Sequence, residues 1–269
     1  MDIQSNETAE LCSIAVQAAM RAGEVLRQGF RSSYQVSSKD SIHNVVTPYD
    51  HEAESVIIDV IKNRFPKHTF LAEERGGERK CDSVLWIIDP LDGTLNFVHQ
   101  IPLFAVSIAA YTRGEVVAGV VFLPMTFELF IAEKGQGAYL NGSRIGVSKT
   151  NELKNAFTVT GMPSGTKGNA LNHIQPLLNF IQLENPIRDL GSAAIHLAYL
   201  AAGRIDVFWI PRLQPWDMAA GKLIVEESGG TVSHYDRGAH QIFPEANLVA
   251  TNGLLHDQMI QQLEVQHEV

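Results

Sequence analysis

The residues best suited to chemistry lie in the segment Trp-Ile-Ile-Asp-Pro-Leu-Asp-Gly-Thr-Leu-Asn-Phe at 86–97. An apolar run ends at Asp89, the proline that follows is expected to stop the strand there, and Gly93 allows the chain to turn. Asp89 and Asp92 are three positions apart at this strand end, so both carboxylates can face one point together with the backbone carbonyl of Leu91. Such oxygen ligands suit Mg²⁺, which proteins typically bind through one or two carboxylates and the phosphate oxygens of a substrate.

The residues that follow these two acids could hold a phosphate group. Gly93 lets the backbone approach a ligand closely, and the N–H groups after it can point at an anion. On its own, Asp-Pro-x-Asp-Gly is an ordinary turn, so the interpretation depends on other acidic positions. Three such positions stand at the end or the start of an expected element: Glu73 with Glu74, Asp217, and Asp50. Each alone would suggest a solvated loop or an acid favoured by a helix dipole.

The apolar periodicity indicates the elements that must position these acids. Helical spacing predicts helices at 7–30, 50–66, 170–182, 192–202, 216–228 and 256–265. Short apolar runs predict strands at 84–88, 104–111, 116–123, 128–133, 138–140, 157–160, 205–209, 230–234 and 247–251. Asp50 stands where an N-cap residue is favoured. Arg113-Gly114 and Asn141-Gly142 are candidate hairpin turns, which favours an antiparallel sheet in the first half of the chain.

The order of these elements predicts layered α+β or α/β packing, because helices come first, a large sheet follows, and strands and helices then alternate. A soft boundary near residue 150 divides the chain into an N-terminal part, 1–150, and a C-terminal part, 151–269. In the helix predicted at 216–228, the small residues Ala219, Ala220 and Gly221 permit close packing.

Four motifs together resemble the inositol monophosphatase family. They are Asp-Pro-Leu-Asp-Gly-Thr at 89–94, Trp-Asp-x-Ala-Ala-Gly at 216–221, the acid pair at 73–74 and Thr-x-x-Asp at 47–50. These motifs keep the family's order and spacing over nearly the whole chain, which makes the signal far more specific than a short glycine motif. The resemblance implies a five-layer α-β-α-β-α sandwich in which the two parts form one compact unit, with the metal-binding motif in the first part. It also implies a homodimer and sensitivity to lithium.

The resemblance also implies roles for individual residues. It assigns two or three Mg²⁺ ions per site to Glu73, Asp89, the Leu91 carbonyl, Asp92 and Asp217. As catalytic residues it implies Glu73 and Thr94, which would position and activate an attacking water, and Asp50, which would support Thr94. As substrate-binding residues it implies Leu91, Asp92, Gly93, Thr94, Arg188, Gly191, Ser192, Ala193 and Asp217. Lys39 corresponds to a basic residue on the loop that approaches the metals.

The implied activity is Mg²⁺-dependent hydrolysis of a phosphate monoester, with inositol 1-phosphate as the first candidate substrate. Divalent metal ions fit this chemistry, because they offset the charge of the phosphate and of carboxylates that would otherwise repel each other. The alternatives are a related phosphatase that acts on histidinol phosphate, fructose bisphosphate or a nucleotide phosphate, or an interaction protein of transcription complexes with the same fold. The metal ligands do not distinguish the possible leaving groups.

Two residues depart from the family pattern. Leu95 stands where many members carry a second threonine, and it follows the metal-binding loop, so little effect is expected. Ile210 lies seven positions before Asp217, where inositol-specific members commonly carry a glutamate that bonds a sugar hydroxyl. An isoleucine cannot make that bond, so the sequence predicts broad tolerance of small phosphate esters.

The composition limits the possible partners and compartment. The chain carries 30 acidic and 21 basic residues, a formal net charge of −9, which argues against general binding to nucleic acids or to anionic membranes. Two cysteines, Cys12 and Cys81, cannot form a disulfide framework, and the polar start of the chain is unlike a signal peptide. The composition thus favours a cytoplasmic enzyme, and the resemblance implies that its partners are a small phosphorylated substrate and a second copy of itself.

Overall fold

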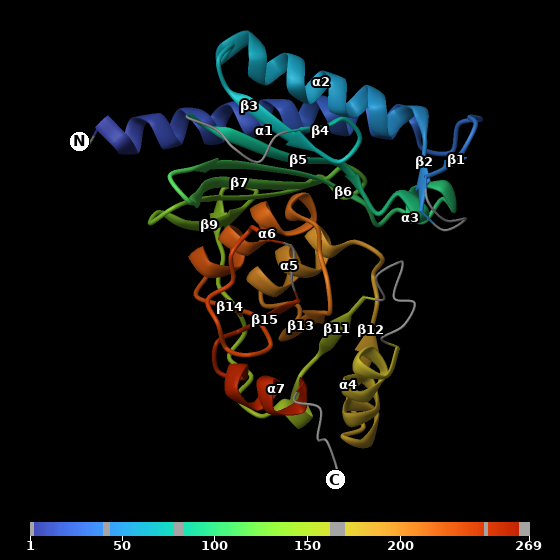
Figure 1. The fold of residues 1–269 in the computed structure, drawn as a ribbon, viewed down its shortest axis with the longest axis vertical. Helices are drawn as coiled ribbons and strands as arrows, with labels where there is room; N and C mark the ends of the chain where they lie inside the picture. Colours follow the sequence, from blue (N-terminus) through green and yellow to red (C-terminus); the bar gives the residue numbers. More distant parts are fainter. Residues whose placement is uncertain (1–2, 40–43, 78–82, 162–169, 245–246, 264–269) are drawn as a thin grey trace.

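The computed structural model describes residues 3–39, 44–77, 83–161, 170–244 and 247–263, and its helices and sheets form five layers (Figure 1). Helices α1 (Ile3–Gly29) and α2 (Pro48–Arg64) cover the outer face of a large sheet. Helices α5 (Ala193–Ala201) and α6 (Pro215–Glu227) lie between this sheet and a smaller one, and α4 (Ala170–Gln182) and α7 (His256–Leu263) cover the far side. The predicted α-β-α-β-α sandwich is confirmed.

The large sheet has the order β10-β9-β8-β7-β6-β5-β3-β4. The bounds of its strands, in chain order, are Thr69–Ala72, Gly76–Gly77, Leu85–Asp92, Ala105–Thr112, Glu115–Leu123, Glu128–Glu133, Gly137–Leu140 and Ser143–Arg144 for β3 to β10. Its neighbours are antiparallel except for the parallel pair β3 and β5. The two predicted hairpins are confirmed, because Thr112 pairs with Glu115 and Leu140 pairs with Ser143.

The small sheet has the order β12-β11-β13-β15-β14 and is mixed. Its strands are β11 (Thr158–Thr160), β12 (Ile187–Arg188), β13 (Val207–Ile210), β14 (Thr231–Ser233) and β15 (Leu248–Thr251). Strand β11 runs parallel to both of its neighbours, whereas β13, β15 and β14 are antiparallel. Four short elements complete the described chain: the paired strands β1 (Ser37–Ser38) and β2 (Val45–Val46), helix α3 (Thr94–Val98) and the 3-10 turn η1 (Leu153–Asn155).

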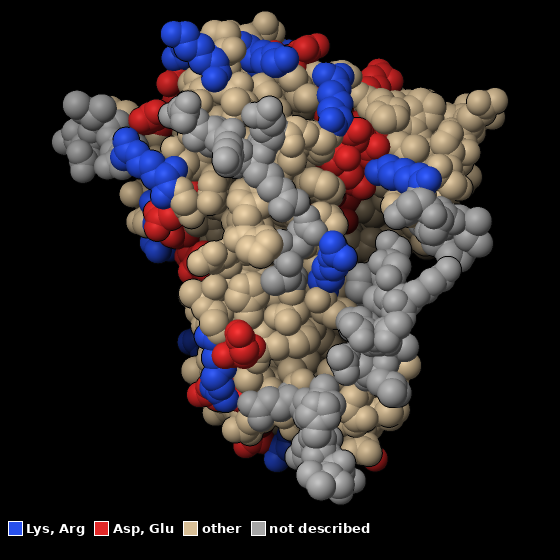
Figure 2. Space-filling model, viewed as in Figure 1, with Lys and Arg blue, Asp and Glu red and all other residues tan. Residues whose placement is uncertain are grey.

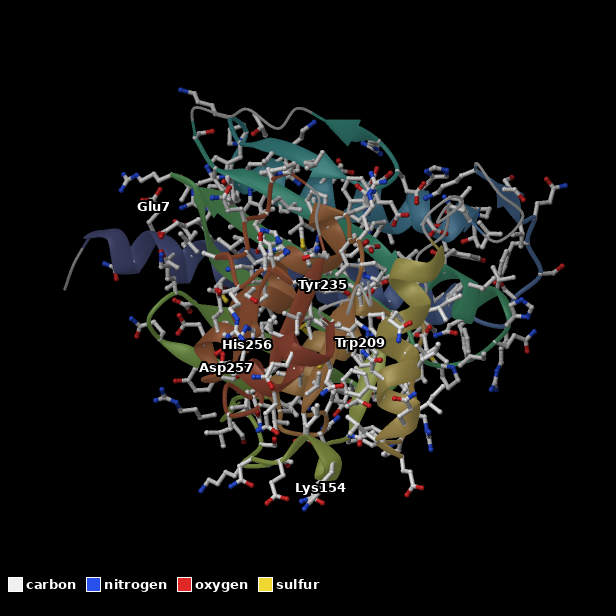
Figure 3. All side chains as sticks on the ribbon, turned by 60° about the horizontal axis from the view of Figure 1, so that its bottom comes forward. Glu7, Lys154, Trp209, Tyr235, His256 and Asp257 are labelled. Atoms are coloured by element: carbon white, nitrogen blue, oxygen red, sulfur yellow. The ribbon has the colours of Figure 1, made fainter. Side chains whose placement is uncertain are left out.

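Strand β13 shows how the side chains divide between layers. Phe208 and Ile210 belong to the large apolar cluster that also contains α5, α6 and one face of the large sheet. Val207 and Trp209 point to the opposite face and join the cluster under α4 and α7, where Trp209 stacks on Phe180 with ring centroids 4.5 Å apart. Figure 3 looks at this end of the molecule and labels Trp209. The alternation of side chains along β13 therefore contributes residues to the apolar clusters on both faces of the small sheet.

The predicted start of the second helix is wrong by about one turn. The helix begins at Pro48, and its N-cap is Thr47, whose side chain accepts a hydrogen bond from the Tyr49 N–H. Asp50 is the third helical residue, and its Oδ2 accepts the Thr47 N–H at 2.8 Å in a capping box. The pattern Thr-Pro-x-Asp therefore predicts the start of a helix better than the acid alone does.

The predicted end of the strand at Asp89 is also wrong. Strand β5 continues through Pro90 to Asp92, with a shift of register between Asp89 and Asp92. A bulge leaves an unpaired residue in the strand, so a proline without an N–H donor is tolerated there. The division of the chain near residue 150 stays a prediction. Among the helices within the described residues, none has the length and apolar character needed to cross a membrane.

Helix α6 approaches strand β7 closely enough to exclude a side chain. A Cβ atom added to Gly119 would lie 2.9 Å from the Ala220 carbonyl oxygen and 3.1 Å from the Ala220 Cα. Likewise, a Cβ on Gly221 would lie 2.6 Å from the Leu197 side chain of α5. The predicted close packing of this small helix face is confirmed, and it fixes how far the start of α6 lies from the sheet.

We expect Gly119→Ala to destabilise the protein by about 1–3 kcal/mol, because the backbone of α6 must move away from β7 to admit the methyl group. Gly146 is the matched control, since a Cβ there would have only the Ser228 carbonyl oxygen near it, at 3.7 Å. Urea unfolding followed by circular dichroism measures both. Equal stability of the two variants would contradict the prediction.

Candidate active site

The irregularity in β5 brings two acids to one face of the large sheet. Asp89 pairs with Ser107 of β6 and Asp92 pairs with Ala105, so two residues of β5 lie opposite one residue of β6. In a regular strand, residues three apart point to opposite faces, and the extra residue cancels that alternation. Both carboxylates therefore point toward the layer of α5 and α6.

The N-terminus of α5 holds Asp92. The Ser192 hydroxyl and the Ala194 N–H each donate to Asp92 Oδ2 at 2.6 Å. Ser192 is also the N-cap of α5, and its Oγ accepts the Ile195 N–H. Hydrogen bonds to a carboxylate at a positive helix end stabilise its charge. Since both bonds reach Oδ2, the other oxygen of Asp92 can bind a ligand.

The start of α6 places Asp217 on the same side. Asp217 is in the first turn of the helix, and its Oδ2 accepts the Gln214 N–H at 3.0 Å. The Ser107 hydroxyl of β6 donates to the Trp216 carbonyl at 3.1 Å, which ties this turn to the strand beside Asp89. Asp89 itself is 1% exposed, and its Oδ1 accepts the Leu91 N–H at 2.9 Å.

Asp50 and Thr94 form a second group beside these acids. Asp50 is fully buried, and Thr94 Oγ1 lies 3.1 Å from its Oδ1 and 3.0 Å from the Leu91 carbonyl. The Thr47 hydroxyl and N–H both donate to the other oxygen of Asp50. The Thr94 hydroxyl proton is thus directed at Asp50 or Leu91, which leaves Oγ1 able to accept a hydrogen bond from a neighbouring group.

Glu73 follows β3 and faces a lysine. Its N–H donates to the Ile88 carbonyl, which continues the parallel pairing with β5. Lys39 Nζ donates to Glu73 Oε1 at 2.9 Å and to Glu74 Oε1 at 2.6 Å. Burial lowers the pKa of Lys39, but the charge of Glu73 and the hydrogen bonds to both glutamates outweigh it, so that pKa is raised. The ammonium offsets part of the negative charge.

The carboxylates that point to this place affect each other's ionisation. Burial, and then the charges of Glu73, Asp92 and Asp217, raise the pKa of Asp89 well above its usual value. Burial and the charges of Asp92 and Glu73 likewise raise the pKa of Asp217. For Asp92, burial raises the pKa to about 6, although the bonds from Ser192 and Ala194 lower it. Negative charge is therefore unfavourable here without added positive charge.

A hard divalent cation fits the donors at this place. All of them are oxygen atoms, and the raised pKa values of Asp89, Asp92 and Asp217 indicate that a nearby positive charge would favour their ionised forms. In the described part of the chain, however, no three Asp, Glu, His or Cys side chains form a cluster ready to hold an ion. Glu73 is paired with Lys39 instead. In Figure 2, acidic atoms gather in the upper right of the visible face, with basic atoms close to them.

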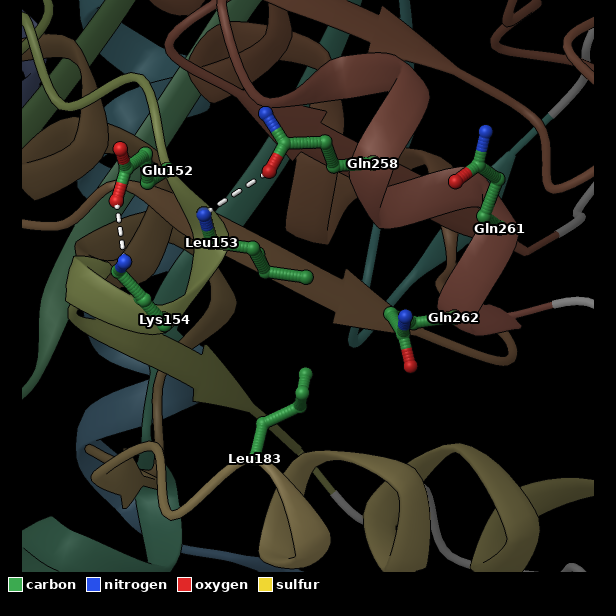
Figure 4. A pocket seen from close by; sticks show the side chains of 7 residues that line it. All are labelled: Glu152, Leu153, Lys154, Leu183, Gln258, Gln261 and Gln262. Carbon is green, nitrogen blue, oxygen red and sulfur yellow. Dashed lines mark hydrogen bonds and ion pairs between the residues drawn. The ribbon is translucent and has the colours of Figure 1, made fainter.

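A cavity elsewhere in the molecule lacks these features. It has a volume of about 390 Å³ and lies between η1, the end of α4 and α7 (Figure 4). Its lining residues are Glu152, Leu153, Lys154, Leu183, Gln258, Gln261 and Gln262. Lys154 pairs with Glu152, and the side-chain Oε1 of Gln258 accepts the Leu153 N–H, so these polar groups already have partners. The acidic group at the end of β5 is the better candidate for chemistry.

Comparison with known proteins identifies the family. The inositol monophosphatase family matches residues 7–268 of the chain. The Nus factor SuhB of Salmonella typhimurium is 43% identical over 244 residues, 90% of this chain and 91% of that protein. An inositol-1-monophosphatase of Mesorhizobium japonicum is 40% identical over 257 residues, 94% of this chain and 96% of that protein. The extragenic suppressor protein SuhB from Bartonella henselae is 40% identical in sequence, and its crystal structure matches with a TM-score of 0.90. That match covers 96% of this chain and 99% of the other chain.

The chain belongs to the inositol monophosphatase family. The resemblance predicted from the motifs is confirmed, and so is the enzyme class, a phosphatase. The roles of individual residues stay predictions, and the structure shows where each side chain lies. It brings Glu73, Asp92 and Asp217 near enough to Asp89 for their charges to raise its pKa, and it connects Asp50 through the Thr94 hydroxyl to the Leu91 carbonyl.

The predicted phosphate-binding turn lies next to the start of α5. Gly93 has φ 97° and Gly191 has φ 75°, so both adopt the left-handed backbone that favours glycine. A Cβ on Gly93 would lie 3.3 Å from the Gly191 carbonyl oxygen, and Ala193 begins α5 directly after Ser192. Arg188 is exposed on the edge strand β12, and its guanidinium donates to the Ile187 carbonyl rather than to these acids.

The side chain of Asn96 connects the turns at Gly93 and Gly191, a role that the sequence analysis did not predict. Its Nδ2 donates to the Leu103 and Leu190 carbonyls, each at 2.7 Å. A Cβ on Gly191 would lie 2.7 Å from the Asn96 side chain, so this contact requires glycine at 191. Nothing in the sequence except the position of Asn96 two residues after the Asp-Gly-Thr motif could have indicated it, because its partners are backbone carbonyl groups and one of them, at Leu190, is 94 positions away.

Ile210 ends β13 and is 7% exposed, within the apolar cluster between the sheets. A Cβ added to Gly161 would lie 3.0 Å from the Ile210 Cδ1, so the side chain packs against the backbone of the residue after β11. The structure thus gives Ile210 a packing role. A carboxylate at this position would have to leave the apolar cluster or be buried in it.

We expect the metal-free protein to lose stability as the pH rises. Burial raises the pKa of Asp92 and of Asp50 from about 3.8 to about 6. A carboxyl group whose pKa is higher in the folded protein stabilises it at low pH and loses this effect as the pH rises through the folded-state pKa. Asp92 and Asp50 are expected to lower the stability mainly between about pH 4 and pH 6. Asp89 and Asp217 extend this loss of stability to higher pH.

Asp92→Asn tests this directly. The amide oxygen can still accept from Ser192 and Ala194, while the charge is gone, so we expect the metal-free variant to be more stable at pH 7 by on the order of 1–2 kcal/mol. Chemical denaturation in a chelator, repeated at pH 4 and pH 7, measures the difference. A variant that is less stable than the wild type at pH 7 would show that repulsion does not dominate there.

Proposed function

We propose that this protein is a Mg²⁺-dependent phosphate monoester hydrolase whose main substrate is inositol 1-phosphate. The convergence of Asp89, Asp92 and Asp217, with raised pKa values, beside the pair Thr94 and Asp50 supports the proposal best. Family membership and the relative named inositol-1-monophosphatase support the substrate class. Two or three ions per site, a homodimer, a cytoplasmic location and inhibition by lithium belong to the same proposal.

The proposed metal ligands are Glu73, Asp89, the Leu91 carbonyl, Asp92 and Asp217. Mg²⁺, when bound, supplies charge that offsets the phosphate and the leaving oxygen and makes a water molecule more acidic. Glu73 must exchange its bond to Lys39 for this role, so the ammonium has to withdraw from Glu73. Lys39 would then be free to approach the negative charge of the bound phosphate.

Thr94 and Asp50 orient the attacking water in this proposal. The Thr94 hydroxyl donates to Asp50 Oδ1, so its oxygen can accept a hydrogen bond from the water. Burial raises the pKa of Asp50 to about 6, which suits a group that takes up and releases protons near neutral pH. Glu73 would orient the same water from the other side. The backbone N–H groups of Gly93 and Thr94 would bind the phosphate oxygens.

The leaving group is the least defined part of the proposal. Ile210 is packed in the apolar cluster, and the Arg188 guanidinium bonds its own strand, so neither makes a specific polar contact near the acids. Histidinol phosphate, fructose bisphosphate and nucleotide phosphates therefore stay alternative substrates. Gly191, Ser192 and Ala193 are the proposed neighbours of the leaving group, although Ser192 also holds Asp92.

A role in transcription complexes is the second candidate function. The relatives named Nus factor SuhB, at 40–43% identity, are as similar to this chain as the inositol-1-monophosphatase at 40%. The activity assay below separates the two candidates. A protein that folds and binds Mg²⁺ but hydrolyses no phosphate ester would favour the interaction role.

We expect Asp92→Asn to keep the fold and to lower kcat by at least 100-fold, because the amide removes a negative charge that binds the metal. Hydrolysis of inositol 1-phosphate, measured as released phosphate against Mg²⁺ concentration, tests this. The wild type should also lose activity in excess chelator and be inhibited by millimolar lithium. Undiminished turnover by the variant, or activity in the chelator, would refute the metal mechanism.

We expect the wild type to show less than about 100-fold selectivity for inositol 1-phosphate. A hydrogen bond from a carboxylate is worth roughly 1.5–3 kcal/mol, or about 10- to 150-fold, and Ile210 cannot supply it. The measurement is kcat/KM for inositol 1-phosphate, glycerol 2-phosphate, histidinol phosphate and a nucleoside monophosphate, repeated with Ile210→Glu and with the apolar control Ile210→Leu. The glutamate variant should shift toward inositol 1-phosphate, and the leucine variant should not. Strong selectivity in the wild type would contradict the prediction.

A further inference from the structure

Helix α2 carries a second buried carboxylate, Glu54, one turn after Asp50. Its side chain is 0% exposed. Glu54 Oε2 accepts the Glu74 N–H at 2.9 Å and the Arg75 N–H at 3.3 Å. Glu54 therefore binds the backbone of the turn that connects β3 to β4, directly after Glu73.

Arg75 holds the same turn from outside. Its Nε lies 3.1 Å from Glu54 Oε1, and its guanidinium also donates to the Ser55 hydroxyl. Two backbone N–H groups and one guanidinium thus converge on a single buried carboxylate. Burying a carboxylate without partners costs free energy, so the partners of Glu54 indicate which part of the structure it holds in place.

Glu73 lies between two fixed points as a result. On one side, its N–H donates to the Ile88 carbonyl of β5, the strand that carries Asp89. On the other side, the next two N–H groups are bound to Glu54. The backbone at 73 can therefore move little, whereas the Glu73 side chain is bound only through its carboxylate to Lys39 among the contacts of the described chain.

We propose that Glu54 is a positioning residue, which holds Glu73 at the distance from Asp89 that metal binding needs. This inference rests on the proposed function, because Glu73 is a metal ligand only there. Asp50 on the same helix bonds Thr94, so α2 would fix both the water-orienting pair and one metal ligand through two acids four residues apart.

Glu227 provides a matched control. Its carboxylate also accepts two backbone N–H groups, from Gly135 at 2.7 Å and from Gly137 at 2.8 Å, in the connection between β8 and β9. Glu227 thus holds that hairpin as Glu54 holds the turn after β3, and its contacts within the described residues do not involve the acids at the end of β5. If the glutamates only stabilise the fold, substitutions at Glu54 and at Glu227 should have the same kind of effect, a loss of stability.

The experiment compares Glu54→Gln and Glu227→Gln with the wild type in two assays. An amide oxygen accepts the two N–H groups more weakly than a carboxylate and cannot pair with the Arg75 charge. We expect Glu54→Gln to raise the Mg²⁺ concentration for half-maximal activity by about tenfold, with a smaller change in KM at saturating Mg²⁺. The rise in Tm that Mg²⁺ causes at a fixed concentration should also shrink. Glu227→Gln should change neither value, even where its metal-free Tm falls.

The outcomes distinguish a failure of this inference from a failure of the proposed function. If Glu54→Gln and Glu227→Gln respond to Mg²⁺ as the wild type does, Glu54 is only structural and the inference is wrong. If the wild type hydrolyses no phosphate ester but Mg²⁺ still raises its Tm, the proposed function fails, and the Tm assay alone tests the positioning. Should Glu54→Gln not fold, Glu54→Asp replaces it, because it keeps the negative charge beside Arg75 but is one methylene too short to reach both backbone N–H groups. That variant should raise the required Mg²⁺ concentration several-fold, and an unchanged requirement would refute the inference.

Discussion

Repulsion between carboxylates at the end of β5 is the constraint on which the rest of the site depends. Asp89, Asp92 and Asp217 each have a raised pKa, and each is raised in part by the charge of other acids in the group. A folded chain holds such a group together only if its backbone leaves the side chains no alternative, or if nearby positive groups offset the charge. The structure uses both means.

The backbone fixes the positions of these acids. The bulge in β5 turns Asp89 and Asp92 to one face, and the close approach of Gly119 to Ala220 sets the distance at which α6 presents Asp217. Partial compensation of charge comes from the start of α5 at Asp92 and from Lys39 at Glu73. Stability and metal binding therefore oppose each other here, since a group that repels itself in the absence of a cation gains most when the cation binds.

Local patterns predicted much of this arrangement, and tertiary contacts account for what they missed. The two hairpins, the layered packing and the close-packed face of α6 were predictable, because each depends on turn residues, periodicity or side-chain size, whereas the order of the five layers was implied by the family resemblance. The continuation of β5 past Asp89 was not, since a proline normally ends a strand and only the pairing with β6 shows the bulge. Asn96 and Glu54 were missed because their partners are backbone groups, and the Leu190 carbonyl and the Glu74 N–H lie far from them in sequence.

The start of α2 shows why structural and functional interpretations of a single acid were hard to separate. Asp50 and Asp217 both lie in the first turn of a helix that begins with proline, and in each case the carboxylate accepts the N–H of the residue before that proline. The cap uses one oxygen of each carboxylate, Oδ2 in both, and fixes the orientation of the side chain. Oδ1 of Asp50 is then directed at Thr94. The acid is therefore a helix signal and a site residue at once, and a cap that fixes the side chain before any ligand arrives reduces the entropy lost on binding.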